Sequence, residues 1–269
     1  MINENISLSI IFPTLNEGDN LKYLIPEFVN VLRGINFENY ELIIIDDGST
    51  DNTKEVVDEL QKKETKLTFI SRNSKPSLPL SIWEGIEKSK SEYVMWLDAD
   101  GSMSAKDSLV LIKQQIKNVD SVIIGSRFVD GGAYKGTLLN EKNKLFNTLR
   151  NLNNSEDSFI AMYLSLLFNK ALSILSKNTV KDMTSGFIIG KKEYFAYESF
   201  QNAFYGDYFV YLVNDLINKN IEIIEIGYEC GLRKYGVSKT GSSFFQLIKL
   251  ARPYLKAALQ SKWGRFENF

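Results

Sequence analysis

Two aspartates, Asp98 and Asp100, follow the apolar run YVMWL with a single alanine between them. In an extended chain, residues i and i+2 project to the same side, so the two carboxylates face one point while Ala99 faces the other way. Carboxylate oxygens suit hard divalent cations, which keep waters and take further oxygens from a substrate phosphate. The pair therefore predicts a site for Mg²⁺ or Mn²⁺. The alternative is that Asp100, Ser102 and Ser104 only cap a following helix.

Other kinds of catalytic chemistry are restricted by composition. The sequence has no histidine, which removes the commonest general base, the serine and cysteine triads that depend on it, and most transition-metal sites. The one cysteine, Cys230, excludes an intramolecular disulfide and a cysteine-rich zinc site, and it favours a reducing compartment. We therefore expect a cytoplasmic protein whose chemistry rests on carboxylates, cations and hard metal ions.

Charge and hydropathy restrict which partners and which membrane segments the protein is expected to have. With 32 Lys and Arg against 33 Asp and Glu, the formal net charge of -1 gives no global attraction to nucleic acid, and we expect none as a partner. The first apolar run is too short for a signal peptide, and the longest later one is broken by Asn169 and Lys170. We expect no transmembrane helix. The 269 residues, 44% hydrophobic, suffice for a sizeable core.

The elements that must position the aspartates alternate in type along the first half of the chain. This alternation predicts an α/β fold with a mainly parallel sheet covered by helices on both faces. We expect strands at 8–14, 41–47, 67–71, 93–99 and 121–126, and helices near 18–33, 52–63, 79–89 and 104–117. In such a sheet, ligands bind at the carboxyl ends of the strands. Polar residues gather after each predicted strand: Asn16, Glu17, Asp46, Asp47, Arg72, Asp98, Asp100 and Arg127.

The second half of the chain is less regular. The segment 130–160 is polar and rich in Asn, Lys and Gly, and we interpret it as a loop with a short helix that serves as an acceptor lid. Further elements are expected as helices at 157–177 and 204–218, strands at 184–190 and 221–229, and a basic and apolar helix from 243 onward.

Six short motifs stand in order at the predicted strand ends and beyond: PTLNE, DDGSTDNT, DADGS, GSRF, VKDMTSGF and RKYGVSKT. With them the sequence resembles the inverting nucleotide-sugar glycosyltransferases of family 2, which have the GT-A fold. Within this family it looks most like the dolichyl-phosphate mannosyltransferase and polyprenyl-phosphate glycosyltransferase group. The resemblance covers residues 6–241. It implies a three-layer sandwich over 1–241, with a nucleotide-sugar half at 1–128, an acceptor half at 129–241 and an amphipathic C-terminal helix at 242–269.

The resemblance also implies roles for the donor-side residues. Binding of the base and ribose of a UDP- or GDP-sugar would fall to Pro13, Thr14, Glu17 and Asp46, with Asp47 close by. Asp98 and Asp100 would hold the metal that bridges the diphosphate and stabilises the leaving nucleoside diphosphate. Ser102 stands where many relatives have Gln.

The resemblance further implies residues that receive phosphate groups of the acceptor or of the donor diphosphate: Arg127, Arg233, Ser238 and Lys239. For Arg127 the alternative is a surface ion pair. A sugar hydroxyl as acceptor needs a carboxylate base, whereas a phosphate monoester is already anionic. Several relatives have an acidic residue where Tyr211 stands, and Asp182 is the best remaining carboxylate, with a turn role as its alternative. Asp207 and Asp215 are further options. We therefore expect a polyprenyl phosphate acceptor.

Two alternatives remain open from the sequence. One is a family 2 enzyme that acts on a hydroxyl of a glycan or small molecule, and the other is a non-catalytic nucleotide-sugar binding protein. A dinucleotide-dependent oxidoreductase is disfavoured because the turn PTLNEGDN lacks the G-x-G-x-x-G pattern. The basic and apolar tail predicts peripheral membrane contact, or else a terminal helix packed on the domain or in a dimer interface.

Overall fold

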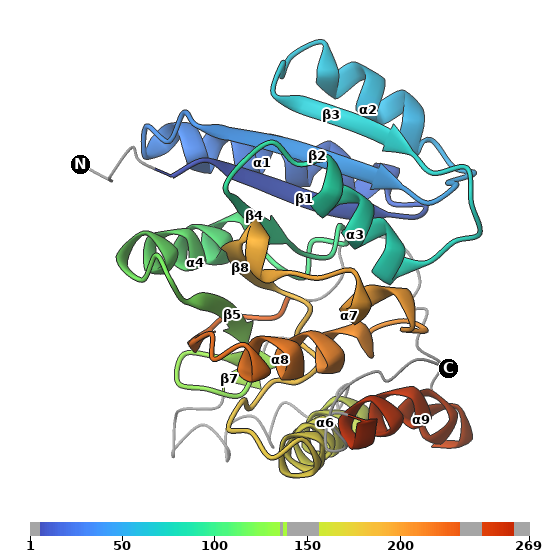
Figure 1. Cartoon of the computed structure of the whole chain (residues 1–269). Helices are drawn as coiled ribbons and strands as arrows, with labels where there is room; N and C mark the ends of the chain where they lie inside the picture. The colour runs from blue at the N-terminus through green and yellow to red at the C-terminus, as the bar shows by residue number, and fades with distance from the viewer. Residues whose placement is uncertain (1–5, 135–136, 139–155, 232–243, 261–269) are drawn as a thin grey trace.

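The computed structural model describes residues 6–134, 137–138, 156–231 and 244–260. Its centre is a seven-stranded sheet with the order β3-β2-β1-β4-β8-β5-β9 (Figure 1). Only β8 runs antiparallel to its neighbours β4 and β5 among these strands, so the sheet is mixed and mostly parallel. The strands are β1 (Leu8–Thr14), β2 (Tyr40–Asp46), β3 (Leu67–Ser71), β4 (Tyr93–Trp96), β5 (Val122–Ser126), β8 (Ile188–Lys191) and β9 (Ile223–Gly227).

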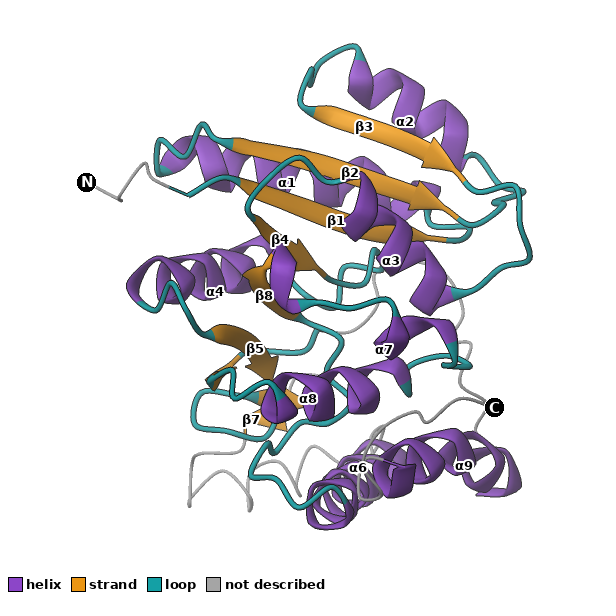
Figure 2. Cartoon of the chain, viewed as in Figure 1, coloured by secondary structure: helices purple, strands orange, loops and turns teal. Residues whose placement is uncertain are grey.

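Helices cover both faces of this sheet (Figure 2). One core cluster joins the sheet to α1 (Gly18–Gly34), α2 (Thr53–Gln61) and α4 (Ala105–Lys117). The other joins the opposite face to α3 (Leu78–Lys88), α6 (Glu156–Leu175), α7 (Glu198–Gln201), α8 (Tyr208–Asn218) and α9 (Phe244–Gln260). Successive residues of β2 alternate between the two clusters, as the period of a strand requires. The predicted three-layer α/β sandwich is confirmed.

The strand before the aspartate pair is shorter than predicted. It ends at Trp96, opposite Ile11 of β1, rather than at residue 99. Ile11 O accepts a hydrogen bond from Leu97 N at 3.4 Å, so odd-numbered residues of β1 direct their main-chain groups toward β4. Pro13, which has no N–H, lies just beyond that contact, where β4 has left the sheet. Proline is tolerated in this central strand because no β4 residue lies opposite it to accept a hydrogen bond. Beyond Trp96 the chain that carries the aspartates leaves the sheet.

The second half contains three further short elements. A ribbon of β6 (Ala133–Tyr134) and β7 (Thr137–Leu138) opens the segment predicted as a lid, and a short 3₁₀ helix, η2 (Lys192–Tyr194), follows β8. Residues 139–155 of the predicted lid lie outside the described residues. Across the described ranges, no helix combines the length and the apolar character that crossing a bilayer requires.

Candidate active site

The loops after β1 and β2 are tied together by side chains of their own residues. Asn16 has a left-handed backbone (φ 57°), and its N–H donates to Ser49 Oγ at 2.7 Å. Its Oδ1 accepts from Thr50 N, also at 2.7 Å. Glu17 N donates to Thr53 Oγ1 at 3.2 Å, and the Glu17 carboxylate accepts from an amide of α1. These contacts give the two loops one fixed shape.

Asp46 lies at the end of β2 within this corner. Its Oδ2 accepts hydrogen bonds from Gly48 N (3.2 Å) and Ser49 N (3.1 Å), which fixes the carboxylate in the turn. Its buried Oδ1 has no hydrogen-bond donor within the part of the chain that the structure describes. Thr14 lies opposite Asp46 in the sheet register, beside Pro13. A buried acceptor without a donor is costly, so a ligand hydroxyl or N–H at this position would be bound favourably.

Asp47, one residue further on, has a different environment. Its carboxylate forms a buried ion pair with Arg72, and its Oδ2 accepts from Ser77 N at 2.5 Å. Arg72 in turn donates to Glu84 of α3 at 3.1 Å. Asp47 therefore fastens the loops after β2 and β3 to the start of α3. The sequence predicts Asp47 close to the bound nucleotide; its described contacts stabilise the scaffold.

Asp98 and Asp100 lie in the loop between β4 and α4. Leu97 and Ala99 are buried and the two aspartates are half-buried, but Ala99 and Asp100 belong to a turn, so the predicted extended chain ends before the second aspartate. Asp100 Oδ1 accepts from Ser102 N at 2.9 Å, next to Gly101 in a left-handed conformation (φ 77°). The Asp100 carboxylate thus closes a tight turn directly after Asp98.

Of the three residues in the helix-capping alternative, Ser104 is the one that caps α4. Its Oγ accepts from Asp107 N at 3.1 Å. Asp100 does not perform this role. The loop is also joined to the segment after β9, since Gly231 N donates to Ser102 O at 2.8 Å. Mg²⁺ is commonly bound through one or two carboxylates plus substrate phosphates, so Asp98 and Asp100 fit an ion of this class.

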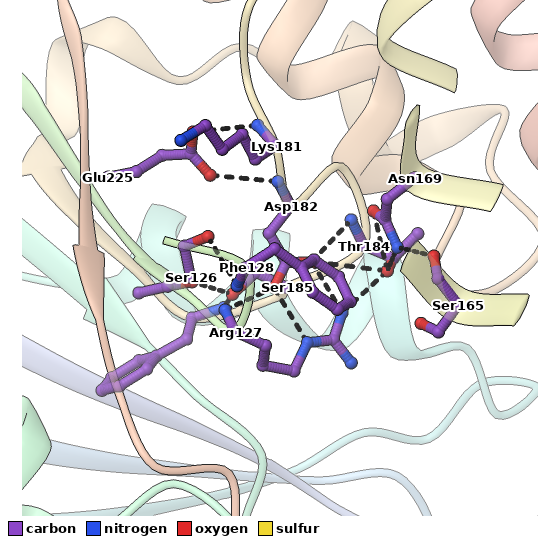
Figure 3. A network of polar contacts seen from close by, with 12 residues as sticks. Ser126, Arg127, Phe128, Ser165, Asn169, Lys181, Asp182, Thr184, Ser185 and Glu225 are labelled. Carbon is purple, nitrogen blue, oxygen red and sulfur yellow. Dashed lines mark hydrogen bonds and ion pairs between the residues drawn. The ribbon is translucent and has the colours of Figure 1, made fainter. Parts of the chain in front are cut away.

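Arg127, the first residue after β5, is bound to Asp182 (Figure 3). Arg127 Nε donates to Asp182 Oδ2 at 2.8 Å, and Nη2 donates to Oδ1 at 2.6 Å. The main-chain N–H of Arg127 also donates to Oδ2, at 2.9 Å. Burial by itself lowers the pKa of the guanidinium, but the Asp182 carboxylate outweighs it and holds the pKa well above its ordinary value. The pair is buried, so it is no surface ion pair.

The pair belongs to a wider network (Figure 3). Arg127 Nη2 also donates to Thr184 Oγ1 at 2.8 Å, and Asn169 of α6 donates to the same oxygen at 3.1 Å. On the other side, Glu225 of β9 accepts from the main-chain N–H groups of Lys181 and Asp182. Because β8 is antiparallel, its beginning lies at the edge where the parallel strands end. The network thereby connects α6, β9, the end of β5 and the loop before β8, which are distant in sequence.

Tyr228 follows β9, and its N–H donates to Ser126 O, next to Arg127, at 3.2 Å. Its phenol is fully buried, and burial raises its pKa well above the ordinary value. The charge of Arg127 lowers this pKa, while Asp182 and Asp98 raise it further. Asp98 and Arg127 follow the ends of β4 and β5, and the ion pair with Arg127 places Asp182, which precedes the antiparallel β8, at the same edge of the sheet.

The remaining carboxylates weighed as a base have other contacts. Asp207 is buried and accepts from Phe204 N (3.0 Å) and Tyr205 N (2.7 Å), so it organises the turn before α8. Asp215 lies further along α8 and forms an ion pair with Lys219 at 2.8 Å. Tyr211 donates to Gln260 of α9 at 2.7 Å. Residues 232–243, with Arg233, Ser238 and Lys239, lie outside the described residues.

Sequence reasoning missed three members of the site: Asn169, Glu225 and Tyr228. Two of them carried a signal. Asn169 is a polar residue inside the apolar run LSLLFNKAL, and Glu225 is an acid inside the strand IIEIG. A polar group within an apolar element usually has a buried partner. Tyr228 had no such signal, because its role depends on three loops that converge in space.

The mixed α/β sandwich with a polar carboxyl edge defines the GT-A class of fold. The chain belongs to glycosyl transferase family 2, whose model matches residues 9–197. Among curated proteins, it is 27% identical over 251 residues to a dolichol-phosphate mannosyltransferase of Pyrococcus furiosus, covering 91% of this chain and 62% of that one. It is 30% identical over 131 residues to a dolichyl-phosphate beta-glucosyltransferase of Trichomonas vaginalis, covering 46% and 41%. The chain thus spans less than two thirds of the length of these relatives.

Solved structures give the same fold. Glucosyl-3-phosphoglycerate synthase from Mycobacterium tuberculosis, in complex with Mn²⁺, uridine-diphosphate and glucosyl-3-phosphoglycerate, superposes with a TM-score of 0.61 at 14% identity. Its complex with Mg²⁺ and uridine-diphosphate gives 0.59, also at 14% identity. Each match covers 98% of this chain and 82% of the other. At this level of identity the likeness concerns the fold.

Proposed function

We propose that the protein transfers a sugar from a nucleotide-diphosphate donor to a polyprenyl phosphate with inversion at the anomeric carbon. In this reaction an oxygen of the acceptor phosphate forms the new bond to the anomeric carbon. The bond from that carbon to the donor diphosphate breaks, and the nucleoside diphosphate leaves. The acceptor oxygen is already anionic, so no proton has to be removed. The family assignment and the names of the two dolichol-linked relatives support this proposal.

On the donor side, the proposal assigns the nucleoside to the corner formed by the first two loops. Asp46 Oδ1 would accept from the ribose or base, with Thr14, Pro13 and Glu17 around it. Asp98 and Asp100 would hold Mg²⁺ or Mn²⁺ against the diphosphate. When bound, the ion supplies positive charge that stabilises the leaving group. UDP and GDP both remain candidate carriers.

The acceptor class rests on one observation: the three carboxylates weighed as a base all have other contacts. Asp182 is fully buried and bound to Arg127, Asp207 binds two main-chain N–H groups, and Asp215 pairs with Lys219. A hydroxyl acceptor requires a carboxylate placed beside it, whereas a phosphate requires cations. We assign phosphate contacts to Arg233, Ser238 and Lys239, and we treat Asp182 as a positioning residue that fixes Arg127 at the acceptor side.

A polyprenyl phosphate resides in a membrane, so the proposal includes peripheral contact at the cytoplasmic membrane face. The test of the function is release of nucleoside diphosphate from UDP- and GDP-sugars with Mn²⁺ or Mg²⁺, with and without a short-chain polyprenyl phosphate. We expect release that needs the metal and rises with the lipid phosphate. Release stimulated by a glycan or small alcohol instead would transfer the acceptor role to a hydroxyl. Binding of a nucleotide sugar without any release would indicate the non-catalytic alternative.

A further inference from the structure

The outer face of α6 is apolar, which is unusual for a helix on the surface of a domain. Tyr163, Leu167 and Ile174 succeed one another at helical spacing and are 59%, 45% and 66% exposed. Leu164 and Leu166 flank them and are exposed as well. A surface helix normally turns its polar side chains toward water. An apolar face of this extent marks a surface that contacts something less polar than water.

The opposite face of α6 faces the protein. Leu172 is fully buried in the core, and Phe168 packs edge-to-face against Tyr254 of α9, with ring centroids 5.7 Å apart. Asn169 is fully buried and reaches the Arg127 network through Thr184. The orientation of α6 is therefore fixed by its inner contacts, and its apolar face is held outward.

Cations accompany this apolar face. Lys170 and Lys177 are exposed on or directly after α6, and Arg252 and Lys256 are exposed on α9. The sequence has no Asp or Glu in 162–177 or in 251–260. The two helices lie side by side at one end of the molecule (Figure 1). Ala257 and Ala258 of α9 are buried, so its basic residues also face away from the core.

We propose that the outer faces of α6 and α9 form a docking surface for an anionic lipid bilayer. Apolar side chains inserted at the boundary of the acyl chains, with Lys and Arg at the level of the headgroups, are the composition of an interfacial helix. Charge complementarity favours anionic lipid over a second copy of this chain, because two copies would bring like charges together. The sequence predicts membrane contact through the tail from 242 onward; the proposed surface adds to the basic residues of α9 the apolar face of α6 and its two lysines.

Docking through this surface would also orient the site. Asn169 lies on the inner side of the helix whose outer side would meet the lipid, and Thr184 joins it to Arg127. An acceptor phosphate at the membrane surface would then approach the edge of the sheet where Arg127 and Asp98 lie. This inference rests on the proposed function for its purpose, but vesicle binding is measured without turnover, so the two can fail separately.

The test is co-sedimentation of the full chain with vesicles of phosphatidylcholine, with and without about one third phosphatidylglycerol. The first variant, Leu164→Ser/Leu167→Ser, removes exposed apolar area and should weaken binding to anionic vesicles about tenfold or more. Its matched control is Val110→Ser on α4, where another exposed apolar side chain is changed away from the docking surface. The thermal unfolding temperature of each variant checks that the fold is retained.

The second variant, Lys170→Glu/Lys256→Glu, tests the cations and should weaken binding by at least about fivefold per residue, because each cation near an anionic surface contributes about that factor. Its control is Lys113→Glu/Lys117→Glu, two exposed lysines of α4. The proposal is overturned if both test variants bind vesicles like their controls. It is also overturned if Leu164→Ser/Leu167→Ser converts a dimer to a monomer while the parent protein does not sediment with lipid.

Discussion

Arg127 and Asp182, 55 residues apart in the sequence, are joined by two side-chain hydrogen bonds of 2.8 and 2.6 Å. The carboxylate is fully buried and the arginine side chain is 14% exposed. These hydrogen bonds connect the end of β5 to the loop before β8 at one edge of the sheet. Loss of either partner leaves the other charge buried without compensation.

Asp182→Asn should therefore lower the free energy of unfolding by about 3 to 5 kcal/mol, the range for breaking a buried ion pair. Urea unfolding followed by circular dichroism measures this change. The matched control is Asp120→Asn, which removes the exposed partner of Lys191 and should lower stability far less. Equal losses in the two variants would contradict the structural role of the pair.

The adjacent residues Asp46 and Asp47 should respond oppositely to the same change. Asp47→Asn breaks the buried pair with Arg72 and should cost about 3 kcal/mol of stability or more. Asp46→Asn keeps one oxygen for the turn contacts at Gly48 and Ser49, so stability should change little. It should weaken nucleoside diphosphate binding about tenfold or more, because it alters a buried acceptor. Isothermal titration calorimetry with UDP and GDP, paired with urea unfolding, separates the two effects. A loss of stability in Asp46→Asn together with a loss of binding in Asp47→Asn would contradict both assignments.

How far the sequence predicted this site depends on the kind of contact. The sheet, its helices and the gathering of polar residues at strand ends followed from alternating hydrophobic runs, because those runs are set by burial on both faces. The antiparallel β8 was not predicted as such, since strand direction is decided by tertiary pairing. The partner of Arg127 could not be predicted either. From the sequence Asp182 resembles a turn residue, and only the pairing of β8 with β5 places it beside Arg127. The sequence also could not distinguish Asp47 from its neighbour Asp46, because the partner of Asp47, Arg72, follows a different strand.

Asp98→Asn and Asp100→Asn should each reduce metal-dependent turnover by about a thousandfold, because in the proposed mechanism each would lose a charged ligand of the cation that stabilises the leaving group. Both residues are half-buried in a loop, so the unfolding temperature should stay within a few degrees of the parent value. Asp58→Asn on α2, which changes an exposed carboxylate elsewhere, is the control. A variant that unfolds, or one that retains turnover and metal dependence, would show that the pair is structural.

The buried phenols predict a fall in stability at alkaline pH. Burial raises the pKa of Tyr208 and Tyr228 well above the ordinary value near 10. Below about pH 10 both the folded and the unfolded chain hold these protons, so the contribution to stability is constant. Above it the unfolded chain loses them first, and the free energy of unfolding falls by up to about 1.4 kcal/mol per pH unit for each group.

Tyr228→Phe removes one of these groups while it keeps the ring, which packs edge-to-face on Phe187 at 5.1 Å. Urea unfolding between about pH 9 and pH 11 should therefore show a shallower loss of stability than in the parent protein. Tyr23→Phe, which changes an exposed tyrosine of α1, should leave the slope as it is. A parent slope retained in Tyr228→Phe would contradict the assignment.

The most direct measurement of the central claim is the chemical identity of the product. The purified protein would be incubated with Mg²⁺ or Mn²⁺, the nucleotide sugar that supports release, and a short-chain polyprenyl phosphate, and the reaction followed by phosphorus NMR and mass spectrometry. We predict that the phosphate monoester of the lipid becomes a phosphodiester that carries one hexose, in step with release of nucleoside diphosphate and only with Asp98 and Asp100 intact. A lipid that stays a monoester while a hydroxyl compound gains the sugar would contradict the claim.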